Sequence, residues 1–201
     1  MKKFEGFKSE AAPKREILPA DVYVGAIQND KIDGMEPDQT LILRIEIIEG
    51  PYAGYFTKRY HDDSQSAGFN QKYTAKYKGD FRLRIPNPNN PKSQHPEWDA
   101  RNFNNAMYAI EHSNPGITFD WDKIFEGDFA FLKGKTVGIN VREGTFNGNP
   151  YTTIGRLEVA DDVRNGAVKA MPPMKPRGDA AATAQPDSNG FTPVEVDELP
   201  F

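Results

Sequence analysis

Regular alternation of apolar and polar residues marks the β-strands that the chain is expected to form. The segment DVYVGAIQ (21–28) alternates along its length, and TLILRIEIIEG (40–50) places an aliphatic residue at every second position. A period of two is typical of a strand with one buried face. YFTKRYH (55–61) follows the turn EGPYAG and is predicted as a third strand.

Two further strands are predicted later in the chain. KTVGINVRE (135–143) and YTTIGRLEVA (151–160) flank the sequence GTFNGNP, which contains Asn147 and Gly148. An Asn-Gly pair between two alternating segments is the strongest local signal for a β-hairpin. These two segments are therefore expected to pair with each other.

The stretch from about 64 to 133 has a different pattern and is predicted as a helical and loop insertion. Its first part spaces three aromatic residues as one stripe of a helix, Phe69, Tyr73 and Tyr77. The proline-rich segment PNPNNPKSQHPEW is expected to be a loop. The next segment, DARNFNNAMYAIEHSNPG, predicts a second helix with Asp99 as its N-cap and Gly116 beyond its end.

This order of elements predicts a mainly β fold. Three strands, a helical connection and a hairpin are the order of a five-stranded Greek-key barrel, the OB-fold, while an antiparallel sandwich is the main alternative. The domain is predicted to span residues 18–165, after a loosely held arm at 1–17. Residues 166–201 are rich in Pro, Ala, Asp and Gly, and such a composition predicts a disordered tail.

The charges are distributed unevenly along the chain. Residues 178–201 contain five of the 29 acidic side chains and none of the 25 basic ones. The rest of the chain is therefore close to neutral and can hold local basic patches. A purely acidic end is typical of a solvated interaction segment.

Composition also limits the compartment and the chemistry. The chain has no Cys, which excludes disulfides, thiolate catalysis and Cys-based zinc sites. No apolar stretch approaches the roughly 18 residues that span a bilayer, and the N-terminus lacks the apolar run of a signal peptide. We therefore expect a cytoplasmic protein, in the host cell if the chain is encoded by a phage.

Cationic and aromatic residues are expected together on the solvent side of the strands. If the aliphatic faces point inward, each of four strands presents one arginine outward, Arg44, Arg59, Arg142 and Arg156. Aromatic residues lie on the same faces or at strand ends, Tyr23, Tyr55, Phe146 and Tyr151. Lys58 adjoins Arg59, and the segment QKYTAKYKGDFRLR adds a basic flank that includes Lys72, Lys76, Lys78, Arg82 and Arg84.

Arginines and lysines among aromatic rings suit single-stranded nucleic acid. The cations bind phosphates, and unpaired bases stack on the rings without sequence readout. Counterion release adds an electrostatic contribution that depends on salt. The alternatives are outward residues that serve solubility and cross-strand pairing, and an aromatic stripe that belongs to the core.

Catalytic and metal-binding motifs are absent from the sequence. HDD (61–63) and DWD (120–122) could offer oxygen ligands to a divalent cation, but neither matches a known metal loop. The chain contains only three His residues, and it has no phosphate-binding loop or nucleophile elbow. We therefore predict no enzyme activity, no metal and no cofactor. A metal-dependent nuclease using Asp62, Asp63 or Asp120 is kept as an alternative.

The last residues have the features of a docking peptide. Leu199 and Phe201 are apolar anchors, and Pro200 between them lowers the entropy lost on binding. A basic or backbone-donor pocket can bind the terminal carboxylate. Asp197 and Glu198 favour a basic partner.

The tail DELPF resembles the acidic, Phe-terminated end of bacterial and phage single-stranded DNA-binding proteins. The segment YTTIGRLEVADDV is similar to the last strand of that family's OB domain. LPADVYVGAI and LILRIEIIEGPYAG resemble the opening strands of small phage replication-module proteins. The insertion at about 64–133 departs from the compact bacterial domain.

The resemblance implies sequence-independent binding of single-stranded DNA during phage DNA replication, recombination or repair. It also implies that the tail recruits replication or repair proteins and that the protein has no catalytic activity. The tail is expected to compete for the DNA groove when DNA is absent. The alternatives are an adaptor or virion β-domain that binds no nucleic acid, and an RNA-binding OB module.

Overall fold

The computed structural model describes residues 17–66 and 76–175. Within these ranges no helix has the length and apolar character needed to cross a membrane. The elements follow one another as β1 (Val22–Asp33), β2 (Thr40–Ile47), α1 (Tyr55–Ser66), β3 (Asp80–Arg84), α2 (Pro96–His112), α3 (Trp121–Phe125), the short 3-10 helix η1 (Ala130–Leu132), β4 (Thr136–Phe146), β5 (Asn149–Glu158) and α4 (Ala160–Arg164).

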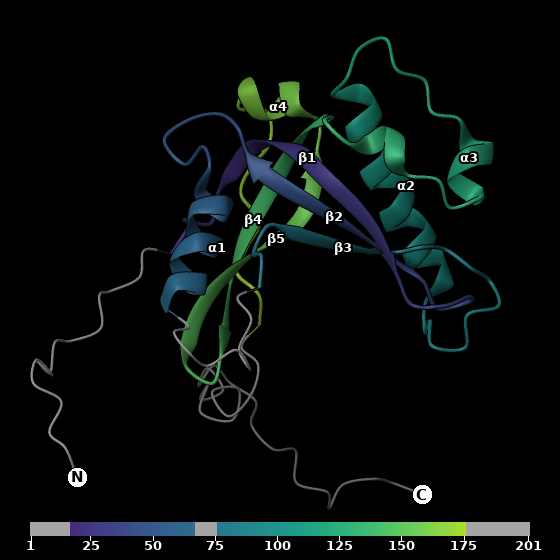
Figure 1. Cartoon of the computed structure of the whole chain (residues 1–201), viewed down its shortest axis with the longest axis horizontal. Helices are drawn as coiled ribbons and strands as arrows, with labels where there is room; N and C mark the ends of the chain where they lie inside the picture. The colour runs from purple at the N-terminus through teal and green to yellow at the C-terminus, as the bar shows by residue number, and fades with distance from the viewer. Residues whose placement is uncertain (1–16, 67–75, 176–201) are drawn as a thin grey trace, which may run out of the picture.

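The strands form one antiparallel sheet in the order β3-β2-β1-β4-β5 (Figure 1). The neighbours β4-β1-β2-β3 have the spatial order of a Greek key, although a helix interrupts the connection between β2 and β3. The sheet is not closed into a barrel, since β3 and β5 are its two edges. The prediction of a mainly β fold with five strands is confirmed, whereas a closed barrel is not seen among the described residues.

The third predicted strand, 55–61, is wrong because this segment begins helix α1. Its first turn is capped by a residue of another element, because the buried carboxylate of Glu46 on β2 accepts hydrogen bonds from it. One oxygen of Glu46 accepts from the Phe56 amide at 3.0 Å, and the other accepts from the Thr57 amide at 2.6 Å. A helix leaves its first amides without partners, so such an acceptor stabilises the helical state.

The third strand in the sheet is instead β3, within the stretch that was predicted as an insertion. It pairs with β2 so that Leu83 lies opposite Leu41, and both side chains are buried. Of the predicted aromatic stripe, only Tyr77 belongs to the described residues, and it precedes β3 without being part of a helix.

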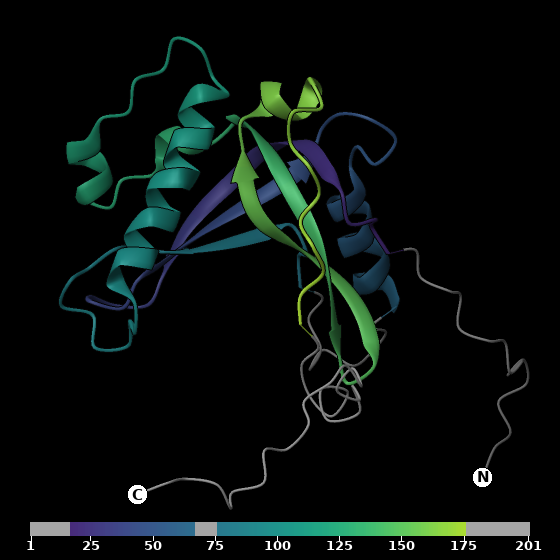
Figure 2. The same cartoon turned by 180° about the vertical axis from the view of Figure 1, so that it is seen from behind.

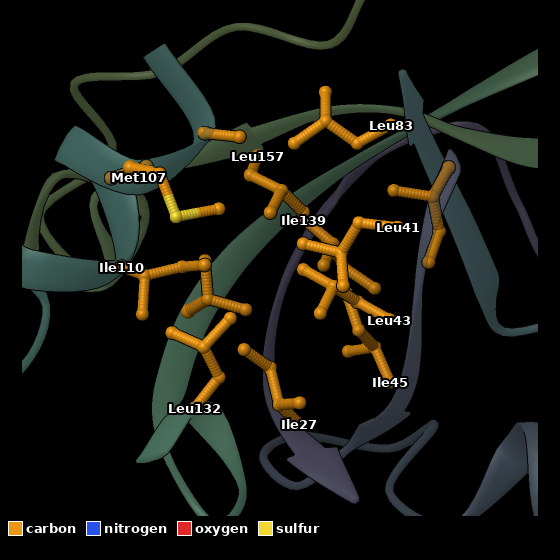
Figure 3. Close-up of a cluster of buried hydrophobic side chains, with 14 of the residues drawn as sticks. Ile27, Leu41, Leu43, Ile45, Leu83, Met107, Ile110, Leu132, Ile139 and Leu157 are labelled. Atoms are coloured by element: carbon orange, nitrogen blue, oxygen red, sulfur yellow. The ribbon is translucent and has the colours of Figure 1, made fainter. Parts of the chain in front are cut away.

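The core lies between the sheet and helix α2. The alternate aliphatic residues predicted for β2 are all buried, Leu41, Leu43, Ile45 and Ile47. From α2, Met107 and Ile110 pack toward Ile139 and Leu157 of the sheet (Figure 3). This packing is the expected result of one apolar stripe along a helix.

Helix α2 begins earlier than predicted. Its N-cap position is His95, followed by Pro96 in the first turn, and the predicted cap Asp99 lies inside the helix. Proline suits this position because the first amides of a helix have no intrahelical acceptor. The Asp99 carboxylate accepts a hydrogen bond from Ser93 Oγ at 2.5 Å.

Residues 167–175 form a strap across the β4–β5 hairpin, visible in yellow-green in Figure 2. Asn140 of β4, fully buried, donates to the Lys169 carbonyl and accepts from the Met171 amide, both at 3.0 Å. The Met174 amide donates to the Glu143 carbonyl at 2.8 Å. The packed region therefore extends to residue 175, past the predicted start of the tail at 166, because Asn140 supplies partners for the strap backbone.

Candidate nucleic-acid interface

The described part of the molecule contains a groove of about 1200 Å³. Its walls come from α1, the outer parts of β2 and β3, and the tip of the β4–β5 hairpin. Figure 1 shows α1 and this hairpin on one side of the molecule, away from α2 and α3. We call this hollow the α1 groove.

Cations dominate the charged lining of the α1 groove. They come from separate elements and are Arg44, Arg59, Lys76, Lys78 and Arg82. Among the described lining residues, the single carboxylate is Asp80. Low-dielectric walls around charges of one sign concentrate the electrostatic potential, so the α1 groove favours anions.

Arg44 is held in a fixed position within this lining. Its guanidinium carbon lies 4.7 Å from the ring centre of Tyr77, an arrangement that stabilises the cation over the ring. Its Nε donates to Asp80 at 3.0 Å, and this hydrogen bond raises the pKa of Arg44 above its usual value. Arg44 therefore stays charged, with its side chain about half exposed to the groove.

Tyr77 connects the groove to the buried carboxylate of Glu46. The Tyr77 hydroxyl donates to Glu46 Oε2 at 2.9 Å, and burial raises the pKa of Tyr77 above its ordinary value. Because the same carboxylate caps α1, Glu46 positions both the helix wall and the ring beneath Arg44. Two parts of the groove wall, the start of α1 and the Tyr77 ring, are therefore held by the same buried carboxylate.

Aromatic rings line the α1 groove on both sides. Tyr55 and Tyr60 come from α1, whereas Phe146 and Tyr151 come from the hairpin. Tyr60 is 38% exposed and Phe146 is 58% exposed, so both offer ring surface to a ligand. Planar exposed rings beside cations are suited to stacking of unpaired bases.

Six of the predicted binding residues line the α1 groove, Arg44, Tyr55, Arg59, Lys76, Phe146 and Tyr151. The structure thus brings together residues that lie more than 100 positions apart in the sequence. Lys72 and the tail residues Asp197, Glu198, Leu199, Pro200 and Phe201 lie outside the described residues.

The other four predicted binding residues lie elsewhere. Tyr23 packs edge-on against Tyr52, with ring centres 5.7 Å apart, and burial raises the pKa of Tyr23 to about 12. Lys58 is on the outer side of α1, where it forms an ion pair with Asp62 at 3.2 Å. Arg142 and Arg156 are on the hairpin but do not line the α1 groove.

Arg142 is partly buried beneath the strap. Its side chain and that of Met171 occupy the space that a Cβ atom on Gly155 would need. The Nε atom of Arg142 is buried without a hydrogen-bond partner in the described structure. The prediction placed Arg142 on an open face because it did not include a strap over this part of the hairpin.

Tyr60 is the groove residue that sequence analysis missed. In a strand over 55–61, Tyr60 would lie on the face opposite Tyr55 and Arg59. In helix α1, however, Tyr55 and Arg59 are four positions apart and share a side, and the next residue, Tyr60, also lines the groove. The helical spacing of the ion pairs Lys58–Asp62 and Arg59–Asp63 was the available signal.

A second hollow, of about 530 Å³, separates the two edge strands of the sheet. We call it the seam, since β3 and β5 lie on either side of it and α2 closes one end. Arg82 lines both the seam and the α1 groove. Arg84 and Arg156 also line the seam, and each forms an ion pair, Arg84 with Asp99 and Arg156 with Glu158.

The carboxylates considered for a divalent cation have other contacts. Asp62 pairs with Lys58 and Asp63 with Arg59, while Asp120 caps α3 by accepting from the Asp122 and Lys123 amides. No cluster of three or more potential ligands for a metal ion occurs within the described ranges.

No family model and no curated protein matches the chain.

Proposed function

We propose that the α1 groove binds single-stranded DNA without sequence preference, and that the protein protects such strands during DNA replication, recombination or repair. The observation that supports this best is the composition of the lining. The described part of the lining holds five cations, the exposed rings of Tyr60 and Phe146, and a single carboxylate. A duplex hides its bases, whereas a single strand offers phosphates to the cations and base faces to the rings.

The order of the strands supports a relationship to the OB-fold. Joining the edge strands β3 and β5 across the seam would give the cyclic order β1-β2-β3-β5-β4, a five-stranded Greek-key barrel. We propose that the domain is an open form of this barrel. OB-folds bind oligonucleotides on the face of strands 2 and 3 and on the loop between strands 4 and 5, which are the places where Arg44, Arg82 and Phe146 lie.

We further propose that the C-terminal tail recruits replication or repair proteins. The strap supports this by fixing the point from which the tail departs. Its Met174 amide donates to Glu143 near the hairpin tip, and Met174 and Tyr151 both lie against Gly144. The described part of the chain therefore ends beside the hairpin wall of the α1 groove, and we propose that the acidic segment that follows in the sequence competes with DNA for this groove.

Fluorescence anisotropy with labelled oligo-dT tests the proposed binding. We expect tight binding that weakens as salt rises, and weak binding to a duplex of equal length. Arg59→Ala should lower the affinity, whereas Lys58→Ala, which removes a cation from the outer side of the same helix, should not. A parallel titration with an RNA oligomer distinguishes a DNA-binding protein from an RNA-binding one.

The outcome that contradicts the proposal is equally direct. Failure of the full chain and of a chain lacking residues 193–201 to bind any oligonucleotide at low salt would exclude the groove as a nucleic-acid site. The adaptor or virion β-domain would then become the leading hypothesis. Deletion of 193–201 should otherwise leave DNA affinity equal or higher, and a large loss would exclude competition by the tail.

A further inference from the structure

We propose that the bound strand continues beyond the α1 groove, through the seam, to a second stacking platform formed by Tyr108 and Trp121. This inference rests on the proposed function, because it extends the path of the same ligand. It assigns a role to α2 and α3, which lie between β3 and β4 in the sequence. In Figure 1 these helices are on the side of the molecule opposite α1.

The platform is a third hollow, of about 470 Å³, between α2 and α3. Tyr108 and Trp121 line it together with Asn104, Asn105 and Glu111. Tyr108 is 56% exposed and Trp121 is 39% exposed. Large aromatic side chains are usually buried in a domain of this size, so two exposed rings in one hollow indicate a binding surface.

Shared lining residues connect the three hollows into one path. Arg82 lines both the α1 groove and the seam. Asn105 lines both the seam and the hollow with Tyr108 and Trp121. A strand that leaves the α1 groove past Arg82 therefore meets α2 at Asn105, beside the two rings.

The two rings are held in place by their neighbours. Tyr108 stacks on His112, with ring centres 3.7 Å apart. Trp121 is the first residue of α3, directly after the N-cap Asp120, and its ring meets Phe119 edge-on at 6.4 Å. The Phe119 amide donates to Glu111 of α2 at 3.1 Å, which ties the α3 side of the hollow to the α2 side.

The charges around this platform differ from those of the α1 groove. Glu111 lines the hollow, and Asp120 and Asp122 flank Trp121, so phosphates are not favoured there. The amide side chains of Asn104 and Asn105 can form hydrogen bonds with bases or sugars. We therefore infer that the platform binds base faces, and that its contribution to affinity depends little on salt.

The positions of the two tryptophans allow a direct test. The chain contains only Trp98 and Trp121. Trp98 is on the same helix as Tyr108 and is 55% exposed, but it stacks on His95 and lines none of the three hollows. Trp98→Phe leaves Trp121 as the single tryptophan, whose emission is excited selectively over that of the tyrosines, and Trp121→Phe is its matched control.

Each variant is titrated with oligo-dT of about 6 and about 16 nucleotides, which span the usual site sizes of such folds. We expect the long oligomer to quench Trp121 in the Trp98→Phe variant and the short oligomer to leave it unchanged. Trp121→Phe should show little quenching with either. Tyr108→Ala and Trp121→Ala should lower affinity for the long oligomer roughly fivefold or more, with the salt slope unchanged.

The affinity of each variant for the short oligomer controls for folding, because the α1 groove should be intact. Salt-dependent binding of the long oligomer without Trp121 quenching, and with unchanged affinity in Tyr108→Ala, would overturn the platform while leaving the proposed function in place. Absence of binding by either oligomer would overturn the proposed function and the platform with it.

Discussion

Arg44 and Arg142 lie on strands of the same sheet and have the same side chain, but their surroundings are different. Arg44 is held over Tyr77 and faces the α1 groove. Arg142 packs against Gly155 and Met171 beneath the strap. The difference comes from a distant segment in each case. Near Arg44, helix α1 stands beside the sheet and leaves a groove, whereas near Arg142 the strap crosses the hairpin and covers it.

In each region, one buried polar side chain forms the hydrogen bonds that hold the neighbouring segment in place. Glu46 accepts hydrogen bonds from α1 and from Tyr77, and so determines the shape of the α1 groove. Asn140 binds the backbone of the strap at Lys169 and Met171. The alternating pattern of a strand does not show whether an outward arginine faces an open groove or lies beneath a covering segment. Helix α1 and the strap, which make this difference, are not part of the strands that carry the two arginines.

The largest effect is expected from Glu46→Ala. This change removes the acceptor of the Ile47, Phe56 and Thr57 amides. It also leaves the Tyr77 hydroxyl with its longer hydrogen bond to the Ile45 carbonyl, at 3.3 Å. The free energy of unfolding should fall by about 3 kcal/mol, and DNA affinity should fall as well because Tyr77 no longer positions Arg44. Urea denaturation and anisotropy measure the two effects.

Glu46→Gln and Glu49→Ala are the controls for that variant. The first retains one oxygen acceptor and should lose less stability. The second removes an exposed carboxylate that pairs with Arg164, which should cost about 1 kcal/mol or less. Stability of Glu46→Ala equal to that of the unchanged protein would show that Glu46 does not hold the helix in place.

A smaller loss of about 1.5 kcal/mol is expected from Asn140→Ala, because the side chain loses its hydrogen bonds to the strap. The strap should detach, so that trypsin cleaves between Lys169 and Ala170 faster than in the unchanged protein. DNA affinity should stay within twofold, since Asn140 does not line the α1 groove. Asn149→Ala, at the exposed hairpin tip, is a control for stability and cleavage alone, because Asn149 lines the α1 groove, and it should change neither of the two. Unchanged cleavage in Asn140→Ala would mean that other contacts retain the strap.

The comparison of Arg44 with Arg142 can be tested directly through the salt dependence of DNA binding. Arg44→Ala should reduce the slope of log affinity against log salt by about 0.7, the value for one phosphate contact on a single strand. Arg142→Ala should leave this slope unchanged, because the strap covers its side chain. Equal slopes for the two variants would contradict the different roles assigned to the two regions.

Much of the sheet could be predicted from local patterns. The period-two segments gave β1, β2, β4 and β5, and the Asn147–Gly148 pair placed the hairpin. Helix α1 was missed because its capping acceptor, Glu46, lies on another element. Strand β3 was missed because five residues in a basic, aromatic segment carry too short a pattern.

The candidate site could be predicted only in part for the same reason. Arg44, Phe146 and Tyr151 follow from outward positions on correctly placed strands. The position of Tyr60 depends on a helix that the apolar pattern did not indicate, although the charge spacing did. The position of Arg142 depends on a strap that a composition rich in proline gave no reason to expect. Local periodicity identifies which side of a strand is buried, but it does not show what covers the other side.

The smallest expected effect concerns the pH dependence of stability at Tyr23, outside both regions. Burial raises its pKa from 10.0 to about 12, so the unfolded chain loses this proton at a lower pH than the folded protein does. Tyr23 therefore stabilises the fold below pH 10, and this contribution is lost as the pH rises from 10 toward 12. Urea denaturation across this range should show a smaller decline for Tyr23→Phe than for the unchanged protein. The same decline in both would show that Tyr23 ionises equally in the folded and unfolded states, and that its packing against Tyr52 does not exclude water.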